Sequence, residues 1–222
     1  MKRKIKIILL LTVFLILAFI TAAGIAYRAT LLVPEEYARV VEISADEAET
    51  LSQQALKKAT ALASDIQNVK RWETLFSESE INGWLAGDFV NNHRDAIPRS
   101  LKDPRVVFEE NKVTFFCRAQ KGSWDSVLSL TLSVAFQGPN QIAFRIHKMR
   151  SGMLPLPQWR FKSTSEYIAR RLKWPLRWEH VEGDLVALLT IVPERLEEGR
   201  RIVVDDVRVG DREIYLSGTS KE

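Results

Sequence analysis

The sequence predicts an α+β protein: an N-terminal transmembrane helix, followed by one domain with a strongly twisted antiparallel sheet and two to three helices. Three observations predict it. Residues 7–27 are almost wholly apolar, two later stretches carry apolar side chains at helical spacing, and from Arg105 onward apolar and polar side chains alternate along consecutive segments. Strands that follow one another, rather than alternating with helices, are typical of antiparallel sheets, and such sheets twist.

The apolar segment Ile7–Tyr27 has no ionisable side chain before Tyr27. At about 1.5 Å per residue, a helix of this length crosses the ~30 Å hydrocarbon core of a bilayer. The basic residues of the tail 1–6 predict that this tail is cytoplasmic and that the rest of the chain is exported. The alternative is a signal peptide cleaved near Thr21–Ala23, but an apolar run longer than about 7–15 residues favours a retained signal anchor.

Capping boxes predict where the helices of the domain begin. The first, SADE at Ser44–Glu47, begins a helix with a narrow, alanine-rich apolar stripe, which favours close packing inside the domain; a coiled coil with a partner is the alternative. The stripe consists of Ala48, Leu51, Ala55, Leu62 and Ile66. The second, SESE at Ser77–Glu80, begins a helix with four apolar residues on one face. These are Ile81, Trp84, Leu85 and Phe89. A third box, at Ser163–Glu166, predicts a shorter helix that ends before Pro175.

Consecutive strands are predicted from Arg105 onward, separated by turn residues. The expected strands are RVVFEE, KVTFFCRAQ, WDSVLSLTLSVAF, QIAFRIHKM, RWEHVEGDLVALLTIVP, RIVVDDVRV and EIYLSG. In the third of them, one face carries Leu128, Leu130, Leu132, Val134 and Phe136, and the other carries Ser129, Thr131 and Ser133. The sheet is therefore expected to have one apolar face and one solvent-exposed face. The exported domain is predicted over residues 44–222, after a connector at residues 28–43.

Charge and motif content exclude several classes of function. The chain has 32 Lys and Arg against 28 Asp and Glu, but four of the basic residues lie in the N-terminal tail, so the domain gives no reason to expect a nucleic-acid partner. Cys117 is the only cysteine, which excludes an intramolecular disulfide, and the three histidines lack metal-ligand spacing. The sequence HRD at His93–Asp95 lacks the other kinase motifs, and the adjacent Asp205 and Asp206 point to opposite faces of a strand. We therefore expect no enzyme activity, no metal and no cofactor.

The stretch SGMLPLPQW, Ser151–Trp159, places apolar side chains among two prolines directly after a strand. It lies in a window, from Arg145 to Trp178, that has nine basic residues and one acidic residue, Glu166. Such a window suits a surface that touches anionic lipid headgroups, because basic side chains attract phosphates while apolar ones enter the interface. The expected membrane or mouth contacts are Met153, Leu154, Leu156 and Trp159, and the expected headgroup contacts are Lys162, Arg170, Arg171 and Lys173. The alternative is that the loop caps one end of the core.

The motifs FSESEINGWL, GMLPLP and PERLEEGRRIVVDDVRVGDREIYLSG, together with the N-terminal anchor, resemble the YpmS-like family of uncharacterised membrane-anchored bacterial proteins. More loosely, the chain is similar to tubular lipid-binding domains, in which a long helix lies in a highly curved sheet. The resemblance covers most of the chain after residue 70, with the acidic-then-Asn motif at Ser77–Asn82 and the apolar-proline loop at Gly152–Pro157. It implies that Asn82 is structural, and it does not account for the helix at 44–66.

The sequence therefore predicts a single-pass protein of the cytoplasmic (inner) membrane of a bacterial envelope, with its C-terminal domain extracytoplasmic. The expected function is non-catalytic binding of a lipid or another hydrophobic ligand between the apolar face of the sheet and the helices. The expected lining residues are Leu128, Leu130, Leu132, Val134 and Phe136. Membrane lipid is the expected partner. The alternative is an envelope scaffold without a cavity, which presents the helix at 44–66 to a protein partner.

Overall fold

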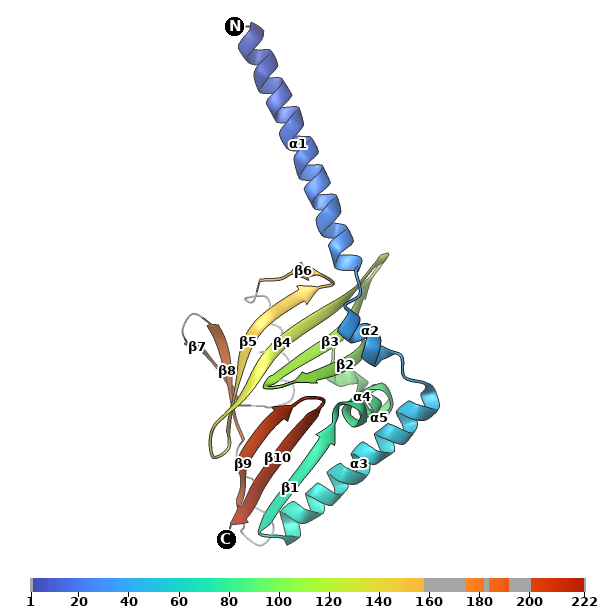
Figure 1. The fold of residues 1–222 in the computed structure, drawn as a ribbon, viewed down its shortest axis with the longest axis vertical. Coiled ribbons are helices and arrows are strands. Elements are labelled where there is room, and N and C mark those ends of the chain that lie inside the picture. The colour runs from blue at the N-terminus through green and yellow to red at the C-terminus, as the bar shows by residue number, and fades with distance from the viewer. Residues whose placement is uncertain (1, 158–174, 182–183, 192–200, 222) are drawn as a thin grey trace.

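A computed structural model describes residues 2–157, 175–181, 184–191 and 201–221 of the chain (Figure 1). The helix predicted to begin at Ser163–Glu166 lies outside these ranges. The first element is α1 (Lys2–Leu31), a continuous helix that projects from one end of the domain (Figure 1). In the part of the chain that the structure describes, it is the one helix long and apolar enough to cross a membrane, and the domain buries none of its apolar window. It is compatible with a single-pass anchor or with a signal sequence.

The segment after α1 contributes to the core of the domain. It contains a short helix, α2 (Glu35–Val41), whose Tyr37 and Val40 side chains are buried. They pack in one cluster with Val107, Phe116 and Val127 of the sheet. Residues 28–43, predicted as a connector, therefore hold part of the domain. Burial of the Tyr37 hydroxyl raises its pKa to about 12.

Both capping boxes in the described ranges begin helices where the sequence predicts them. The helix α3 (Ala45–Asn68) begins after Ser44, whose side chain accepts a hydrogen bond from the amide of Glu47. The helix α4 (Glu78–Ala86) begins after Ser77 with the full reciprocal box to Glu80. Its apolar face is shorter than predicted, because α4 ends at Ala86 and a short helix α5 (Asp88–Asn92) and a 3₁₀ turn η1 (Arg94–Ala96) follow.

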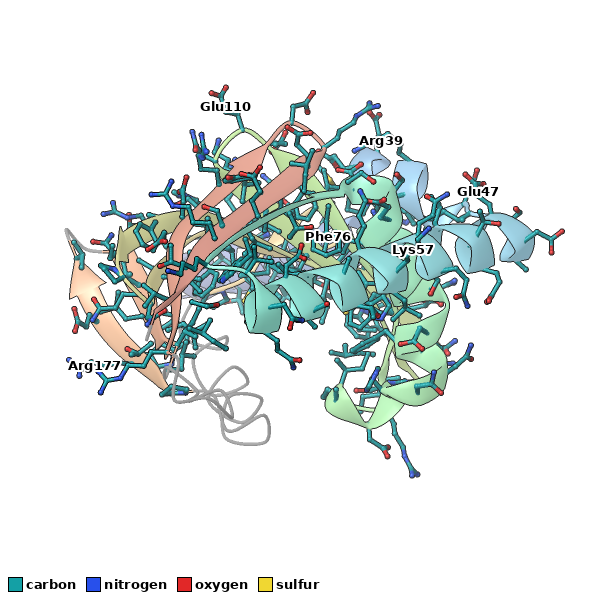
Figure 2. The ribbon with its side chains drawn as sticks, turned by 90° about the horizontal axis from the view of Figure 1, so that it is seen from below. Arg39, Glu47, Lys57, Phe76, Glu110 and Arg177 are labelled. Carbon is teal, nitrogen blue, oxygen red and sulfur yellow. The ribbon has the colours of Figure 1, made fainter. Side chains whose placement is uncertain are left out.

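Of the four residues predicted on one face of α4, Ile81 and Leu85 pack against the core, while Trp84 and Phe89 form a separate aromatic pair with ring centroids 5.2 Å apart. The alanine-rich stripe of α3 packs within the chain, against α4, β1 and β10. The polar side of α3 projects into solvent, as Glu47 and Lys57 show in Figure 2.

The strands form two antiparallel sheets rather than the single sheet predicted. The larger sheet has the order β2-β3-β4-β5-β8-β7, with β6 paired to β5. Its strands are β2 (Leu101–Glu109), β3 (Lys112–Lys121), β4 (Trp124–Gly138), β5 (Gln141–Ser151), β6 (Leu154–Pro155), β7 (Leu176–Val181) and β8 (Asp184–Thr190). The smaller sheet has the order β1-β10-β9, from β1 (Arg71–Ser77), β9 (Arg201–Gly210) and β10 (Glu213–Lys221). The strand β1 is not among the predicted strands.

The larger sheet has an inner face, which turns toward α4 and the smaller sheet, and an outer face. Inner-face residues pack with Val209 and Ile214 of the smaller sheet and with Ile81 of α4. They include Val106, Phe108, Val113, Leu130, Leu132 and Val134. The outer face is polar along part of β3 and β4, where the Thr114 and Thr131 hydroxyls lie 3.0 Å apart. Near α1, however, α2 covers it, so the predicted solvent-exposed face is only partly exposed.

Candidate functional site

The five residues predicted to line a ligand site share the inner face of β4, but they differ in environment. The register of β4 with β3 alternates without interruption. The β4–β5 ladder shifts twice, at the β5 side between Ile146 and Lys148 and at the β4 side between Phe136 and Gly138. Toward the end of β4 that is far from α1, Leu132 is 7% exposed, and Val134 and Phe136 pack against a core of Trp72 and its neighbours. In this half of the inner face Leu132 is therefore buried, whereas Val134 and Phe136 are partly buried and covered by the Trp72 cluster.

The half of the inner face nearer α1 keeps part of its apolar surface exposed. Leu128 and Leu130 are only partly buried, as is Met149 of β5, which is the partner of Leu130 in the β4–β5 ladder. On the other side, Phe115 of β3 pairs with Leu130 and is 46% exposed, and Cys117 pairs with Leu128. We call these five residues (Phe115, Cys117, Leu128, Leu130 and Met149) the open half.

The open half offers contact surface but no reactive group. All its side chains are neutral, and burial, partly offset by Arg94 and Arg105, raises the pKa of the Cys117 thiol to about 11. Cys117 therefore stays a thiol at neutral pH and is a poor nucleophile. Across the residues that the structure describes, no three His, Cys, Asp or Glu side chains are placed to hold a metal ion. The open half therefore presents mainly apolar contact surface.

The apolar-proline loop lies beside the end of α1 and divides into two environments. Met153 is 48% exposed, whereas Leu154 and Leu156 are half-buried, because β6 folds back onto β5 and the Leu156 amide donates to the carbonyl of Met149. The loop thus covers part of the edge of β5, while Met153 projects from it. The other predicted contacts, Trp159, Lys162, Arg170, Arg171 and Lys173, lie outside the described residues.

The acidic-then-Asn motif at the start of α4 holds the site's framework in place, a role that spacing alone did not reveal. Asn82 is 1% exposed, and its side-chain amide accepts from the backbone N–H of Val106 and donates to the carbonyl of the same residue, both at 2.8 Å. Glu78 accepts from the amide of Phe108 at 2.7 Å. These contacts satisfy the free edge of β2, because β3 is its only partner strand among the described residues.

Two ion pairs fix α4 from the other side. The Arg39 guanidinium of α2 lies 2.9 Å from the Glu78 carboxylate, beside the start of α4 (Figure 2). The Lys58 ammonium of α3 lies 2.7 Å from Glu80. The motif therefore joins α2, α3, α4 and β2, and the feature that could have revealed it is a polar residue, Asn82, on the otherwise apolar side of a helix.

No family model, curated protein or solved structure matches the chain. The resemblance to the YpmS-like family and to tubular lipid-binding domains therefore stays a prediction.

Proposed function

We propose that this protein is a single-pass membrane protein whose domain binds the acyl chain of a membrane lipid on the open half of the inner face, without catalysing a reaction. The observation that carries the proposal is the Phe115 side chain, which is 46% exposed on the inner face beside the partly buried Leu128 and Leu130, whereas Leu132 further along β4 is buried. Burial of one ligand methylene against such a surface contributes about 0.8 kcal/mol, so a short length of acyl chain gives useful affinity.

The position of the open half favours a lipid over other apolar ligands. It lies at the end of β4 that begins beside α1, since the Trp124 indole donates to the Thr30 hydroxyl at 3.2 Å. With α1 in a bilayer, that end of the sheet is the end nearer the membrane surface. The basic tail before α1 supports a cytoplasmic N-terminus and an extracytoplasmic domain, in the cytoplasmic membrane of a bacterial envelope.

An envelope scaffold was the other function expected from the sequence, with the apolar stripe of α3 as its partner surface. Ala48 and Ala55 of that stripe are buried, and Gly83 of α4 lies so close to Leu51 that an added Cβ would overlap it. The stripe is thus occupied within the chain, which favours lipid binding over the scaffold.

Native mass spectrometry of the full chain, released from mild detergent, tests the proposal. We expect one lipid to stay bound to the wild type at near-stoichiometric amount, and Phe115→Asp to lose it, since a charge on the open half opposes burial of an acyl chain. The matched control is Leu75→Asp on β1, where the side chain is 43% exposed, close to the 46% of Phe115, but lies on the other sheet. Lipid retained equally by the three proteins, or bound by none, would overturn the proposal.

A further inference from the structure

The last turn of α1 is hydrogen-bonded to the domain. Helix ends leave their final carbonyl groups without intrahelical partners, and at the edge of a bilayer such groups are costly to leave unpaired. Here the amide of Met153 donates to the carbonyl of Ala29 at 2.9 Å, and the Ser126 hydroxyl donates to the carbonyl of Thr30 at 2.5 Å. The helix end is therefore completed by groups that come from β4 and from the turn after β5.

The partners of α1 are themselves fixed. Ser126 and Ser151 are 3% and 4% exposed, and their hydroxyl oxygens lie 2.8 Å apart. The amide of Gly152 donates to the carbonyl of Val127 at 2.7 Å, which holds the turn against β4. A network of this kind, buried and bonded on both sides, resists rotation of the helix relative to the sheet.

Gly152 is required by its contact with α1 as well as by its own backbone. Its φ is +55°, in the left-handed region that glycine adopts without strain. In addition, a Cβ at this position would lie 2.5 Å from the carbonyl oxygens of Ala29 and Thr30. The turn can approach the helix this closely only because residue 152 has no side chain.

The docked turn places exposed apolar side chains around the exit of α1. Met153 is 48% exposed, the last residue of α1, Leu31, is 40% exposed, and Leu32 and Val33 directly after the helix are each 56% exposed. We call these four residues the collar. Apolar side chains around the end of a membrane helix lower the free energy when they enter the boundary between the lipid headgroups and the acyl chains.

We infer that the Gly152 turn locks the domain onto the end of α1 and holds the collar in the bilayer interface, so that the sheet has one fixed orientation on the membrane. This inference deepens the proposed function and rests on it, because both take α1 as membrane-spanning. From Ser126 to Leu130 is four residues of strand, or roughly 13 Å. The locked orientation therefore holds the open half close to the bilayer. A lipid can then pass from the bilayer to the open half without first being released into water.

The test uses single cysteines that carry an environment-sensitive fluorophore, in the full chain with Cys117→Ala, reconstituted in phosphatidylcholine and phosphatidylglycerol vesicles. The labelled variants are Met153→Cys in the collar, Leu17→Cys within α1, and Val69→Cys, which is 44% exposed at the far end of the domain, where α3 leads into β1 (Figure 1). We expect lipids that carry a spin label to quench the dyes at 17 and 153, with blue-shifted emission at 153, and to leave the dye at 69 unquenched.

Two glycine variants then test the lock itself. Gly152→Ala is expected to abolish quenching at position 153 while position 17 stays quenched. Gly122→Ala is the matched control, since its φ of +62° imposes the same backbone strain but nothing lies within 4 Å of the added Cβ. We expect it to leave both signals unchanged. Should Gly152→Ala fail to fold, Ser126→Ala removes the bond to Thr30 and is expected to weaken quenching at 153.

The outcomes separate the inference from the proposed function. Equal spectra at 153 and 69, with position 17 quenched, would overturn the inference and leave the anchor intact. Identical effects of Gly152→Ala and Gly122→Ala would overturn the lock. An unquenched dye at position 17 would show that α1 does not insert, and the proposed function would fall with the inference.

Discussion

Asn82→Ala is expected to destabilise the domain strongly, because it removes two hydrogen bonds from a buried site. The Asn82 side chain bonds both backbone groups of Val106 on the free edge of β2. Alanine leaves that N–H and that C=O buried and unpaired, at about 1–3 kcal/mol each, or about 2–6 kcal/mol together. The free energy of unfolding of an ordinary domain is about 5–15 kcal/mol, so this single change removes a large share of it.

Urea unfolding of the full chain in detergent micelles, followed by tryptophan fluorescence, measures the effect. With an m-value of about 2–3 kcal/mol per molar urea, a loss of about 4 kcal/mol lowers the midpoint by roughly 1.5 M. The control is Asn92→Ala, which removes an exposed hydrogen bond of 2.6 Å to Asp88 and is expected to change stability by less than about 0.5 kcal/mol. If Asn82→Ala costs no more than Asn92→Ala, Asn82 does not hold α4 to the sheet.

Three further predictions concern the core and its charges. Gly218→Ala is expected to cost about 1–3 kcal/mol in the same unfolding assay, because the added methyl overlaps the Trp72 ring; an unchanged midpoint would contradict that packing. Burial favours the neutral form of Glu80, but hydrogen bonds from Lys58 and a backbone amide outweigh it and lower the pKa below 4.5. Glu80 therefore stabilises the fold at neutral pH and loses this contribution as the pH falls below 4.5. Glu80→Gln is expected to flatten the dependence of the unfolding free energy on pH in that range, and a dependence as steep as that of the wild type would refute this. Burial raises the pKa of the Cys117 thiol to about 11, so little thiolate is present at pH 8. Cys117 is therefore expected to react with maleimide at pH 8 at least about 100-fold more slowly in the native chain than in urea. Reaction of the native chain at the rate of the unfolded chain would show that the thiol is not buried.

Local patterns predicted the elements that local chemistry specifies. The capping residues Ser44 and Ser77 begin helices where predicted, because a cap and its first turn lie within a few residues of each other. The alternation along β4 likewise placed its apolar residues on one face. Alternation alone did not show that Leu132 is buried while Leu128 is only partly buried, since exposure depends on what other elements cover.

Features that depend on distant partners were missed. The segment of β1 alternates Trp72, Thr74 and Phe76 with Arg71, Glu73 and Leu75, so its pattern is imperfect. Its only partner in the described part of the chain is β10, near the other end of the sequence. The division into two sheets follows from this long-range pairing. In α2, Tyr37 and Val40 lie three residues apart, which is the spacing of a buried helical face. A pattern of two residues in so short a segment does not distinguish a helix from a connector.

Photo-crosslinking tests most directly whether the open half binds an acyl chain. The full chain is reconstituted with a phospholipid that carries a diazirine in its acyl chain, irradiated, and mapped by peptide mass spectrometry. We predict crosslinks at Phe115, Leu128 and Leu130 in addition to those in α1, and none at Leu132, which is buried. Crosslinks confined to α1 would contradict lipid binding by the domain.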